Sequence, residues 1–360
     1  MEFAAWRGGP QEGWPPGATR KGYLFMKKII NDPANFVDET MEGIVAAYGD
    51  RVQFLDGDRR VLVSAYPRKP GKVGIVTGGG FGHLPLFLGY VGAGMVDACA
   101  VGNVFASPSY TKMAAAIRAA DQGAGVLCLF GNYGGDKMNF AQAIDDCEFD
   151  DIRCTSVLGC DDVASSPKET AEKRRGVAGI VYDYKCAGAA ADQLRSLEEV
   201  TAVAEKAVRN LYTIGVALTP CIVPEVGKPT FQIADDELEL GMGIHGEKGI
   251  SVQHITNADD IADQMLDKLL ADAELKKGDE VSVMINGLGG TPLEEQFIVY
   301  RRVAQRLGEL GVSIFMPHIG EFATSMEMAG LSVTLFKLDE ELKELLRAPA
   351  NTPFYTNANK

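Results

Sequence analysis

From about residue 26 onwards, apolar runs of strand length alternate with amphipathic stretches of helical spacing, a pattern typical of an α/β protein. Asp32-Pro33 opens a predicted helix in which Val37, Met41 and Ile44 fall on one face, as do the later Val45 and Tyr48. Residues 72–76 and 125–130 are predicted strands, each followed by a glycine-rich loop. Ligands bind beyond the carboxyl ends of strands in such sheets, so the two loops mark a candidate site.

The same patterns predict a second set of elements further along the chain. Ser196 and Glu199 form a capping box at the start of a long predicted helix, after which the chain crosses to a second domain near residues 213–224. Thr291, Pro292 and Glu294 have the cap, N1 and N3 identities of another helix start. Further strands are predicted at residues 154–158, 178–182, 237–240, 281–285, 311–315 and 331–338.

We therefore expect two α/β domains built on mixed or parallel sheets. The predicted boundaries are residues 26–212 for the N-terminal domain and residues 213–360 for the C-terminal domain. Residues 1–25 differ in composition, with five glycines and both tryptophans of the chain, and are predicted to be a disordered extension without the apolar core of a secretory signal.

Composition narrows the possible partners. The 360 residues carry 35 basic and 49 acidic side chains, and this net charge of −14 argues against nucleic acid and anionic membranes. No apolar run approaches the length needed to span a bilayer, so a soluble protein is expected. The seven cysteines form no C-x-x-C pair and no zinc-binding cluster, which indicates reduced thiols, a cytoplasmic location and no metal site.

Three polar side chains stand out because each is set among glycines, which allow tight turns and close approach to a ligand. They are His83, Asp136 and His245. Their surroundings are Gly-Gly-Gly-Phe-Gly-His at residues 78–83, Asn-Tyr-Gly-Gly-Asp at residues 132–136 and Gly-Ile-His-Gly-Glu at residues 243–247. Two of the four histidines of the chain therefore occupy such loops.

Each of these residues has a chemical interpretation and a structural one. His245, with its ring oriented by Glu247 or another acceptor, could be a nucleophile towards a carbonyl group, or it could cap a turn. His83 follows backbone N–H groups suited to an oxygen or phosphate, or it is a loop histidine held by the backbone. Asp136 is a general base or the N-cap of a following helix. His254 and His318 lack such a setting, and structural roles are expected for both.

Nucleotide-binding motifs are weak or missing. No G-x-x-x-x-G-K-[ST] phosphate loop occurs in the chain. Residues 241–246 match G-x-G-x-x-G, but residues 247–251 make a poor helix start, so the helix N-terminus that would hold a pyrophosphate is not expected. A dinucleotide-dependent enzyme remains a weak alternative.

The three loops, in this order and at this spacing, resemble the substrate-binding K subunit of dihydroxyacetone kinases. The similarity also includes Met-Lys-Lys-Ile-Ile-Asn at residues 26–31, Arg-Arg-Gly-Val-Ala at residues 174–178, Val-Gly-Lys-Pro at residues 226–229 and Gly-Leu-Gly-Gly-Thr-Pro-Leu at residues 287–293. It covers essentially all of residues 26–360.

The resemblance implies a homodimeric subunit that binds a short ketose covalently, as a hemiaminal on His245. It assigns His83 to the proton on the carbonyl oxygen and Asp136 to activation of the terminal hydroxyl. Substrate contacts are implied for Gly80, Phe81, Gly82, Ser107 and Gly131. The phosphate donor is implied to lie on a separate L subunit that holds ATP, or ADP recharged by a phosphotransferase-system protein, with magnesium; no cofactor is expected in this chain.

Three positions depart from the family pattern. Phe81 replaces a serine, Leu84 replaces a glutamate, and Gly131 replaces a lysine that contacts the substrate. Loss of the ammonium group should open volume, while the other two changes should make the loop more apolar. These changes suggest erythrulose or another short ketose as the substrate. A sensing paralogue that acts as a transcriptional coactivator is the alternative from another functional class.

Overall fold

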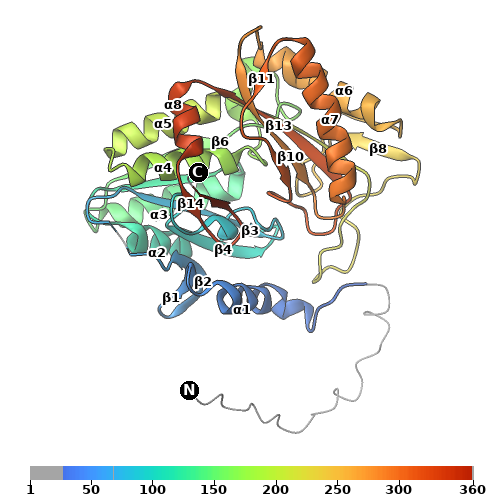
Figure 1. Ribbon diagram of the computed structural model, residues 1–360. Coiled ribbons are helices and arrows are strands. Elements are labelled where there is room, and N and C mark those ends of the chain that lie inside the picture. The colour runs from blue at the N-terminus through green and yellow to red at the C-terminus, as the bar shows by residue number, and fades with distance from the viewer. Residues whose placement is uncertain (1–26, 68, 359–360) are drawn as a thin grey trace, which may run out of the picture.

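The computed structural model describes residues 27–67 and 69–358, in which two β-sheets with helices between and around them form the body of the protein (Figure 1). The predicted extension at residues 1–25 lies outside the described residues. The mixed α/β architecture confirms the predicted fold class. In the described part of the chain, none of the helices combines the length and apolarity needed to cross a membrane.

The first sheet has six strands in the order β1-β2-β4-β3-β5-β6. Strands β3 to β6 run parallel, and β1 and β2 form an antiparallel extension at one edge. The bounds are β1 (Val52–Leu55), β2 (Asp58–Ser64), β3 (Gly74–Phe81), β4 (Ala98–Val104), β5 (Val126–Gly131) and β6 (Cys154–Gly159). The predicted strands at residues 72–76, 125–130 and 154–158 are thereby confirmed, with shifted ends.

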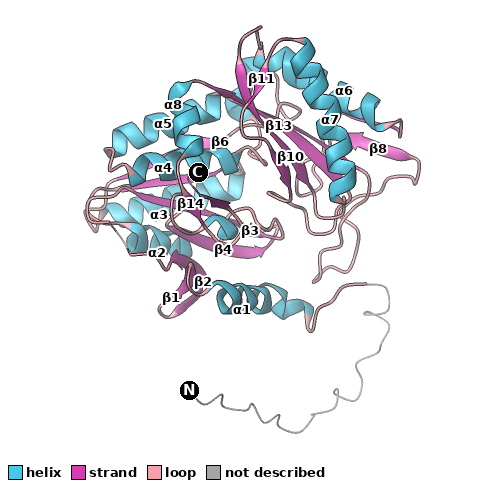
Figure 2. Cartoon of the chain, in the orientation of Figure 1, coloured by secondary structure: helices cyan, strands magenta, loops and turns pink. Residues whose placement is uncertain are grey.

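Helices cover both faces of this sheet (Figure 2). One face packs against α2 and α3, and the other packs against α4 and α5. The helices of this half are η1 (Pro33–Asn35), α1 (Phe36–Tyr48), η2 (Leu88–Tyr90), α2 (Tyr110–Ala120), α3 (Gly134–Glu148), η3 (Lys168–Lys173), α4 (Ile180–Asp192) and α5 (Leu197–Arg209). The predicted capping box is present at α5, where Ser196 and Glu199 bond to each other's backbone N–H.

The strand predicted at residues 178–182 is wrong, because this segment leads into helix α4. Every residue of α4 except Asp192 is buried, since the helix lies between the two sheets. Its Tyr184 hydroxyl bonds to Thr77 of the first sheet at 2.7 Å, and its Tyr182 hydroxyl bonds to Ser282 of the second at 2.8 Å. A helix buried on all sides has no polar face, so its apolar run cannot be told from a strand.

The second sheet has the strand order β11-β10-β13-β7-β8-β9, and β12 also pairs with β10. Alternate residues of β10 face opposite cores: Val281 and Val283 face α6 and α7, while Met284 faces α4. The bounds are β7 (Leu211–Ala217), β8 (Glu237–Leu240), β9 (Ser251–His254), α6 (Ala258–Ala273), β10 (Glu280–Gly287), α7 (Leu293–Glu309), β11 (Ser313–Ile314), β12 (His318–Gly320) and β13 (Gly330–Leu338).

The cap predicted for α7 is wrong. Pro292 is the N-cap of this helix, and it makes no side-chain cap. The Thr291 hydroxyl instead donates to Gly330 O at 2.6 Å and accepts from Gly330 N at 2.8 Å. This residue therefore ties the loop after β10 to strand β13.

The last described segment of the chain returns to the first half of the molecule (Figure 1). Helix α8 (Glu340–Arg347) packs on α4, and the short strands β14 (Ala350–Asn351) and β15 (Thr356–Asn357) follow. The Ala93 and Asn351 backbones bond to each other. We propose that the domain boundary lies just before β7 rather than inside it, and that residues 340–357 belong structurally to both halves.

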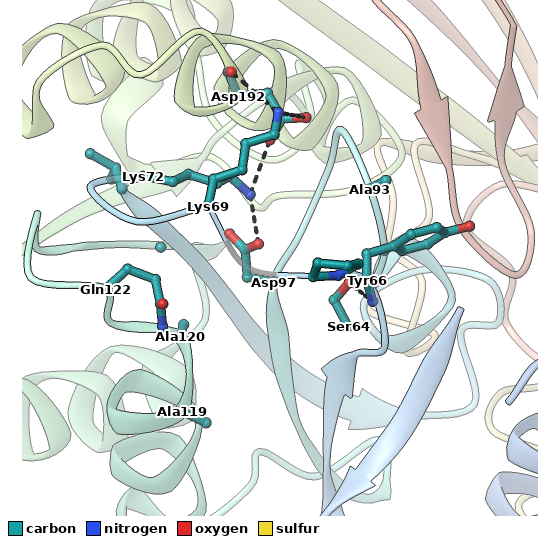
Figure 3. Close-up of a pocket in the computed structure, with 14 residues that line it drawn as sticks. Ser64, Tyr66, Lys69, Lys72, Ala93, Asp97, Ala119, Ala120, Gln122 and Asp192 are labelled. Atoms are coloured by element: carbon teal, nitrogen blue, oxygen red, sulfur yellow. Dashed lines mark hydrogen bonds and ion pairs between the residues drawn. The ribbon is translucent and has the colours of Figure 1, made fainter. Parts of the chain in front are cut away.

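An ion cluster centred on the buried Lys72 lies at the amino end of β3, at the opposite end of the strand from His83 (Figure 3). Lys72 pairs with Asp97 at 2.6 Å and with Asp192 at 3.3 Å, and Lys69 reaches Asp192 from the surface at 3.5 Å. The cavity beside them measures about 220 Å³ and is lined by none of the predicted site residues. Because its charges are paired with one another, the cluster is best explained as structural.

Replacing Lys72 with methionine should destabilise the protein by about 1–3 kcal/mol, because the partly buried Asp97 would lose its cation while still accepting from Ile75 N at 2.9 Å. Burial raises the pKa of Asp97, and Lys72 opposes this effect. The loss should therefore shrink at low pH, where this carboxyl is protonated. Urea unfolding measures it, and Lys69→Met is the control, since this half-exposed lysine should cost less than about 1 kcal/mol. Equal losses from the two variants would contradict the assignment.

Candidate active site

The three predicted polar residues come from three separate segments. His83 follows β3, Asp136 lies in the first turn of α3 after β5, and His245 lies in the loop between β8 and β9. The structure brings the two histidines together, with ring centroids 4.6 Å apart and planes at 84°. Asp136 is close enough to His245 for the imidazole to influence its pKa. The site therefore spans both sheets.

His83 is held from the second half of the chain. Its Nδ1 donates to the Thr324 carbonyl oxygen at 2.8 Å, which leaves Nε2 as the nitrogen with a free lone pair. Burial, reinforced by the neighbouring His245, lowers the pKa of His83 to about 3. The ring is therefore neutral at physiological pH. Its Nε2 is buried and has no hydrogen-bond partner.

The glycines before His83 have a different role from the one predicted. Gly78 and Gly79 lie within β3, paired with β4, rather than in a loop that cradles an anion. A Cβ at Gly79 would lie 2.4 Å from the Phe87 ring, and one at Gly82 would lie 2.8 Å from Phe105. Phe105 in turn stacks on His83 at 4.9 Å. The glycines therefore make room for the aromatic rings that surround this histidine.

His245 is oriented by the carboxylate two residues later. Its Nδ1 lies 2.8 Å from Glu247 Oε1, and its backbone N–H donates to Glu247 Oε2 at 2.9 Å. Burial alone would raise the pKa of Glu247, but the hydrogen bonds and the nearby imidazole outweigh it and bring this pKa to about 2. A carboxylate only accepts, so Nδ1 carries the proton in the neutral form of His245, and Nε2 then carries the lone pair.

Aromatic rings surround His245 on several sides. Tyr133 and Phe105 meet its ring edge to face, at 4.8 Å and 5.3 Å between centroids. The side chain of His245 nevertheless remains 23% exposed, so one part of the ring is open to a small molecule. A histidine that only capped a turn would not need to be surrounded by aromatic rings in this way.

Asp136 is the third titratable group of the site. Burial raises its pKa to about 6, although a hydrogen bond from Ser107 and the nearby His245 both act in the opposite direction. The helix begins two residues before Asp136, at Gly134, so this residue is not the N-cap that the structural interpretation required. Its Oδ1 is buried and has no partner. A carboxyl group with this pKa can act as a base near neutral pH.

The residues implied as substrate contacts differ in where they lie relative to the site. Ser107 lies beside Asp136, and Gly80 packs against the backbone of residues 105–106. Phe81 requires a correction, because its ring is 2% exposed and packs edge to face on Phe36 in the core, at 5.7 Å. It does not make the site more apolar.

Gly131 also differs from expectation. A Cβ at this position would lie 3.0 Å from Tyr133 Cδ2 and 3.5 Å from Ile180, so the volume expected from the missing lysine is already filled. The Tyr133 ring therefore occupies the space beside Gly131 as well as packing on His245. The site has lost an ammonium group at this position without gaining an opening there.

The other two histidines make structural contacts, as expected. His254 is exposed and lies 3.1 Å from Asp236. His318 bonds to the Tyr182 and Tyr355 hydroxyls, each at 3.1 Å, and burial lowers its pKa to about 4. The glycine motif at residues 241–246 is followed by strand β9 rather than by a helix, as expected from residues 247–251.

Unpartnered polar atoms show what the site can bind. In residues 27–67 and 69–358, six buried side-chain nitrogen or oxygen atoms lack a hydrogen-bond partner. Three of them are His83 Nε2, Tyr133 Oη and Asp136 Oδ1, all beside His245. Buried polar groups are rarely left unsatisfied, so this concentration marks a place where a small polar ligand could bind.

Sequence reasoning missed several members of the site. Phe105 belongs to no motif, and no signal in the sequence points to it. Tyr133 and Arg175 stand inside segments that were noted as similar to a family, but they were given no role. The partnership of Glu247 with His245 was foreseen from their spacing.

Comparison with known proteins identifies relatives over nearly the whole chain. The Dak1 domain matches residues 42–354. The "PTS-dependent dihydroxyacetone kinase 2, dihydroxyacetone-binding subunit DhaK" of Listeria innocua is 46% identical over 92% of this chain and 99% of its own length. The "L-erythrulose kinase" of Pectobacterium atrosepticum is 42% identical over 92% of this chain and 56% of its own length.

Two solved structures show the same fold. The "dihydroxyacetone kinase from C. freundii in complex with AMP-PNP and Mg2+" has a TM-score of 0.83 and 31% identity, over 92% of this chain and 61% of that one. The "dihydroxyacetone kinase operon co-activator Dha-DhaQ" has a TM-score of 0.81 and 32% identity, over 87% of this chain and 96% of that one.

Proposed function

Because this chain belongs to the Dak1 domain family, we propose that it is the substrate-binding subunit of a dihydroxyacetone-type kinase. It is a phosphotransferase component that captures a short-chain ketose covalently and presents its terminal hydroxyl for phosphorylation. The observation that carries this proposal is the pairing of His245 with Glu247 beside His83, which leaves a nucleophilic nitrogen next to unsatisfied polar atoms.

Capture begins with the lone pair of His245 Nε2. A nitrogen–carbon bond forms at the ketone carbon, the carbonyl π bond breaks, and its electrons move to the oxygen, which takes up a proton from the solvent. The positive charge left on the imidazole is balanced by the Glu247 carboxylate. His83, neutral because its pKa is about 3, is suited to accept a hydrogen bond from the new hydroxyl rather than to supply its proton. A polyol such as glycerol has no carbonyl and cannot form the bond.

Phosphoryl transfer then needs a base and a donor. Asp136 is assigned to the terminal hydroxyl, whose proton it removes as the phosphoryl group arrives. The donor is assigned to a separate L-type subunit that holds ATP, or ADP recharged by a phosphotransferase-system protein, with Mg²⁺. The absence of a phosphate loop from the sequence and the AMP-PNP and Mg²⁺ bound in the related C. freundii kinase support this division of labour.

The substrate is a short ketose, with dihydroxyacetone and erythrulose as the leading candidates. The relatives include kinases named for each. The replacement of the family lysine by Gly131 favours a change of substrate, and Tyr133 now shapes that part of the site. We therefore expect erythrulose or another short ketose to be accepted at least as well as dihydroxyacetone.

A ketose-sensing role is the second candidate. The likeness to the operon co-activator favours it, since a covalent pocket would also serve a transcriptional coactivator. The buried base Asp136 favours catalysis, because binding alone does not need a base with a raised pKa. Phosphorylation of a captured ketose distinguishes the two functions.

On the basis of the family, we also propose that the protein is a cytoplasmic homodimer active in glycerol metabolism. Strand β9 is an edge strand of the second sheet, and Val252 on it is 49% exposed, with Ile250 and Ile255 also exposed at its ends. An exposed apolar edge of this kind is suited to pairing with a second copy.

The proposed function is tested by native mass spectrometry with dihydroxyacetone, erythrulose and five-carbon ketoses, with glycerol as the control. A hemiaminal loses no water, so the adduct should add the full mass of the ketose, and glycerol should add nothing. Phosphorylated product should then appear only when an L-type subunit, ATP and Mg²⁺ are present. Absence of an adduct with every ketose would reject the proposal, and an adduct without any phosphorylation would favour the sensing role.

A further inference from the structure

Arg175 links the nucleophile to the junction between the two halves of the molecule. It belongs to the Arg-Arg-Gly-Val-Ala segment at residues 174–178, to which the proposed function gives no role. Its side chain is 14% exposed and extends from the segment between η3 and α4 towards the loop that carries His245.

Three groups surround the guanidinium. Its Nε donates to Asp162 Oδ2 at 2.8 Å, and its Nη2 donates to the Gly241 carbonyl at 3.0 Å, at the start of the His245 loop. Its Nη1 lies 4.0 Å from Glu247 Oε2, the oxygen that also accepts from the His245 backbone. Arg175 therefore contacts both the beginning of the loop and the carboxylate that orients His245.

The anchor on the other side of Arg175 is rigid. Asp162 is 2% exposed, and its second oxygen accepts from Ala164 N at 3.0 Å. The backbone N–H of Asp162 donates to the Arg175 carbonyl at 3.1 Å. Asp162 and Arg175 are therefore joined both through their side chains and through their backbones. A planar guanidinium held this way cannot be replaced by an ammonium without losing at least one of these bonds.

Close packing leaves little freedom between these groups. A Cβ on Gly243 would lie 2.2 Å from Glu247 Oε2 and 2.5 Å from Arg175 Nη1. No room for a side chain at residue 243 therefore remains beside the carboxylate and the guanidinium, whose Nη1 and Oε2 lie 4.0 Å apart. Movement of Arg175 would release Glu247, and with it the hydrogen bond that places the proton on His245 Nδ1.

We propose that Arg175 is a positioning residue, which holds Glu247 so that His245 keeps its Nδ1–H tautomer and its Nε2 faces the substrate. This inference rests on the proposed function, to which it adds a residue that touches neither substrate nor reacting atoms. Arg175 affects ketose capture by fixing the position and the tautomer of the His245 ring rather than by changing the overall charge of the site.

The test compares Arg175→Met and Arg175→Lys with the unmodified protein. The ¹⁵N NMR signals of His245, assigned by their loss in His245→Ala, should show protonated Nδ1 and unprotonated Nε2 in the unmodified protein and a mixture of tautomers in Arg175→Met. The rate of ketose capture should fall by roughly 10- to 100-fold, as expected for a small displacement of a reacting group. Arg175→Lys should restore part of the rate, and added guanidinium should partly rescue Arg175→Met.

Arg174→Met is the matched control. Arg174 is also buried, but it bonds to Asp272 and to the Ser166 carbonyl rather than to the His245 loop. This variant should lower the melting temperature yet leave the His245 signals and the capture rate unchanged. An unchanged tautomer and capture rate in Arg175→Met would overturn the inference, as would equal losses of capture in Arg174→Met.

Failure of the inference and failure of the proposed function give different results. If the unmodified protein captures no ketose, the proposed function fails, while the NMR signals still decide whether Arg175 sets the tautomer of His245. If Arg175→Met does not fold, Arg175→Lys still decides the case, because intact His245 signals and full capture in it would contradict a requirement for the guanidinium.

Discussion

Replacement of His245 by alanine is expected to abolish the ketose adduct and to reduce turnover by roughly 10² or more. The methyl group has no lone pair, so the nitrogen–carbon bond cannot form. Intact mass spectrometry after incubation with erythrulose measures the adduct, and a coupled assay with an L-type subunit measures turnover. Noncovalent binding should survive weakly, because His83 and Asp136 remain in place.

His254→Ala provides the control for this prediction. His254 lies on β9 in the same half of the chain, but it is exposed and pairs only with Asp236. Its replacement should leave both adduct and turnover unchanged. A full adduct in His245→Ala would mean that another nucleophile captures the ketose, and the assignment of His245 would have to be abandoned.

Replacement of Asp136 by asparagine should separate capture from transfer. The amide keeps the size of the side chain but cannot accept the proton of the terminal hydroxyl, so turnover should fall by roughly 10²–10⁴ while the adduct persists. The same two assays measure this. Asp146→Asn on the same helix, half-exposed and paired with Arg118, is the control and should be neutral. Loss of the adduct together with turnover would show that Asp136 acts in binding instead.

The raised pKa of Asp136 adds a dependence on pH. Its base form is present above about pH 6, so turnover should decline as the pH falls through this value. The asparagine variant should lack this decline. A pH profile of turnover under saturating ketose measures the difference, and identical profiles for the two proteins would assign the decline to another group.

The same substitution should stabilise the fold. Burial raises the pKa of Asp136 from 3.8 to about 6, so the folded protein binds this proton more tightly than the unfolded chain does. Stability is therefore lost as the pH rises from about 4 to about 6, and at neutral pH the loss is at most about 3 kcal/mol. Asp136→Asn should recover part of it above pH 6 and nothing below pH 4. This trade of stability for activity is common at active sites.

The elements that sequence predicted well are those with a local signal. The α5 capping box and the apolar runs predicted as strands at residues 281–285 and 331–338 are local features of the sequence. All of them are confirmed, the two runs as β10 and β13. Helix α4 could not be predicted, because it is buried on every side and its sequence shows no solvent-facing polar stripe that would mark it as a helix. The Thr291 cap failed for a related reason, since a backbone group from β13 competes for its hydroxyl.

The residues of the site also divide into those that a local sequence signal reveals and those that it does not. His83, Asp136 and His245 could be found because glycines mark their segments, but the reason for the glycines could not. Gly79 makes room for the ring of Phe87, and Gly82 makes room for the ring of Phe105. The sequence does not show that these rings come close to the two glycines in the folded chain. The sequence also could not show whether glycine at position 131 adds volume to the site, because the ring of Tyr133 fills the space beside it.

The attachment of His83 to residues 324–326 affects when the protein becomes reactive. Thr324 N and Met326 N bond to the backbone of His83 and Gly82, and Thr324 O holds the imidazole. During synthesis, the first half of the chain emerges and begins to fold long before this segment leaves the ribosome. A nascent chain would therefore lack the ordered pair of imidazoles, and the proposed ketose capture could begin only after both halves of the chain have been translated.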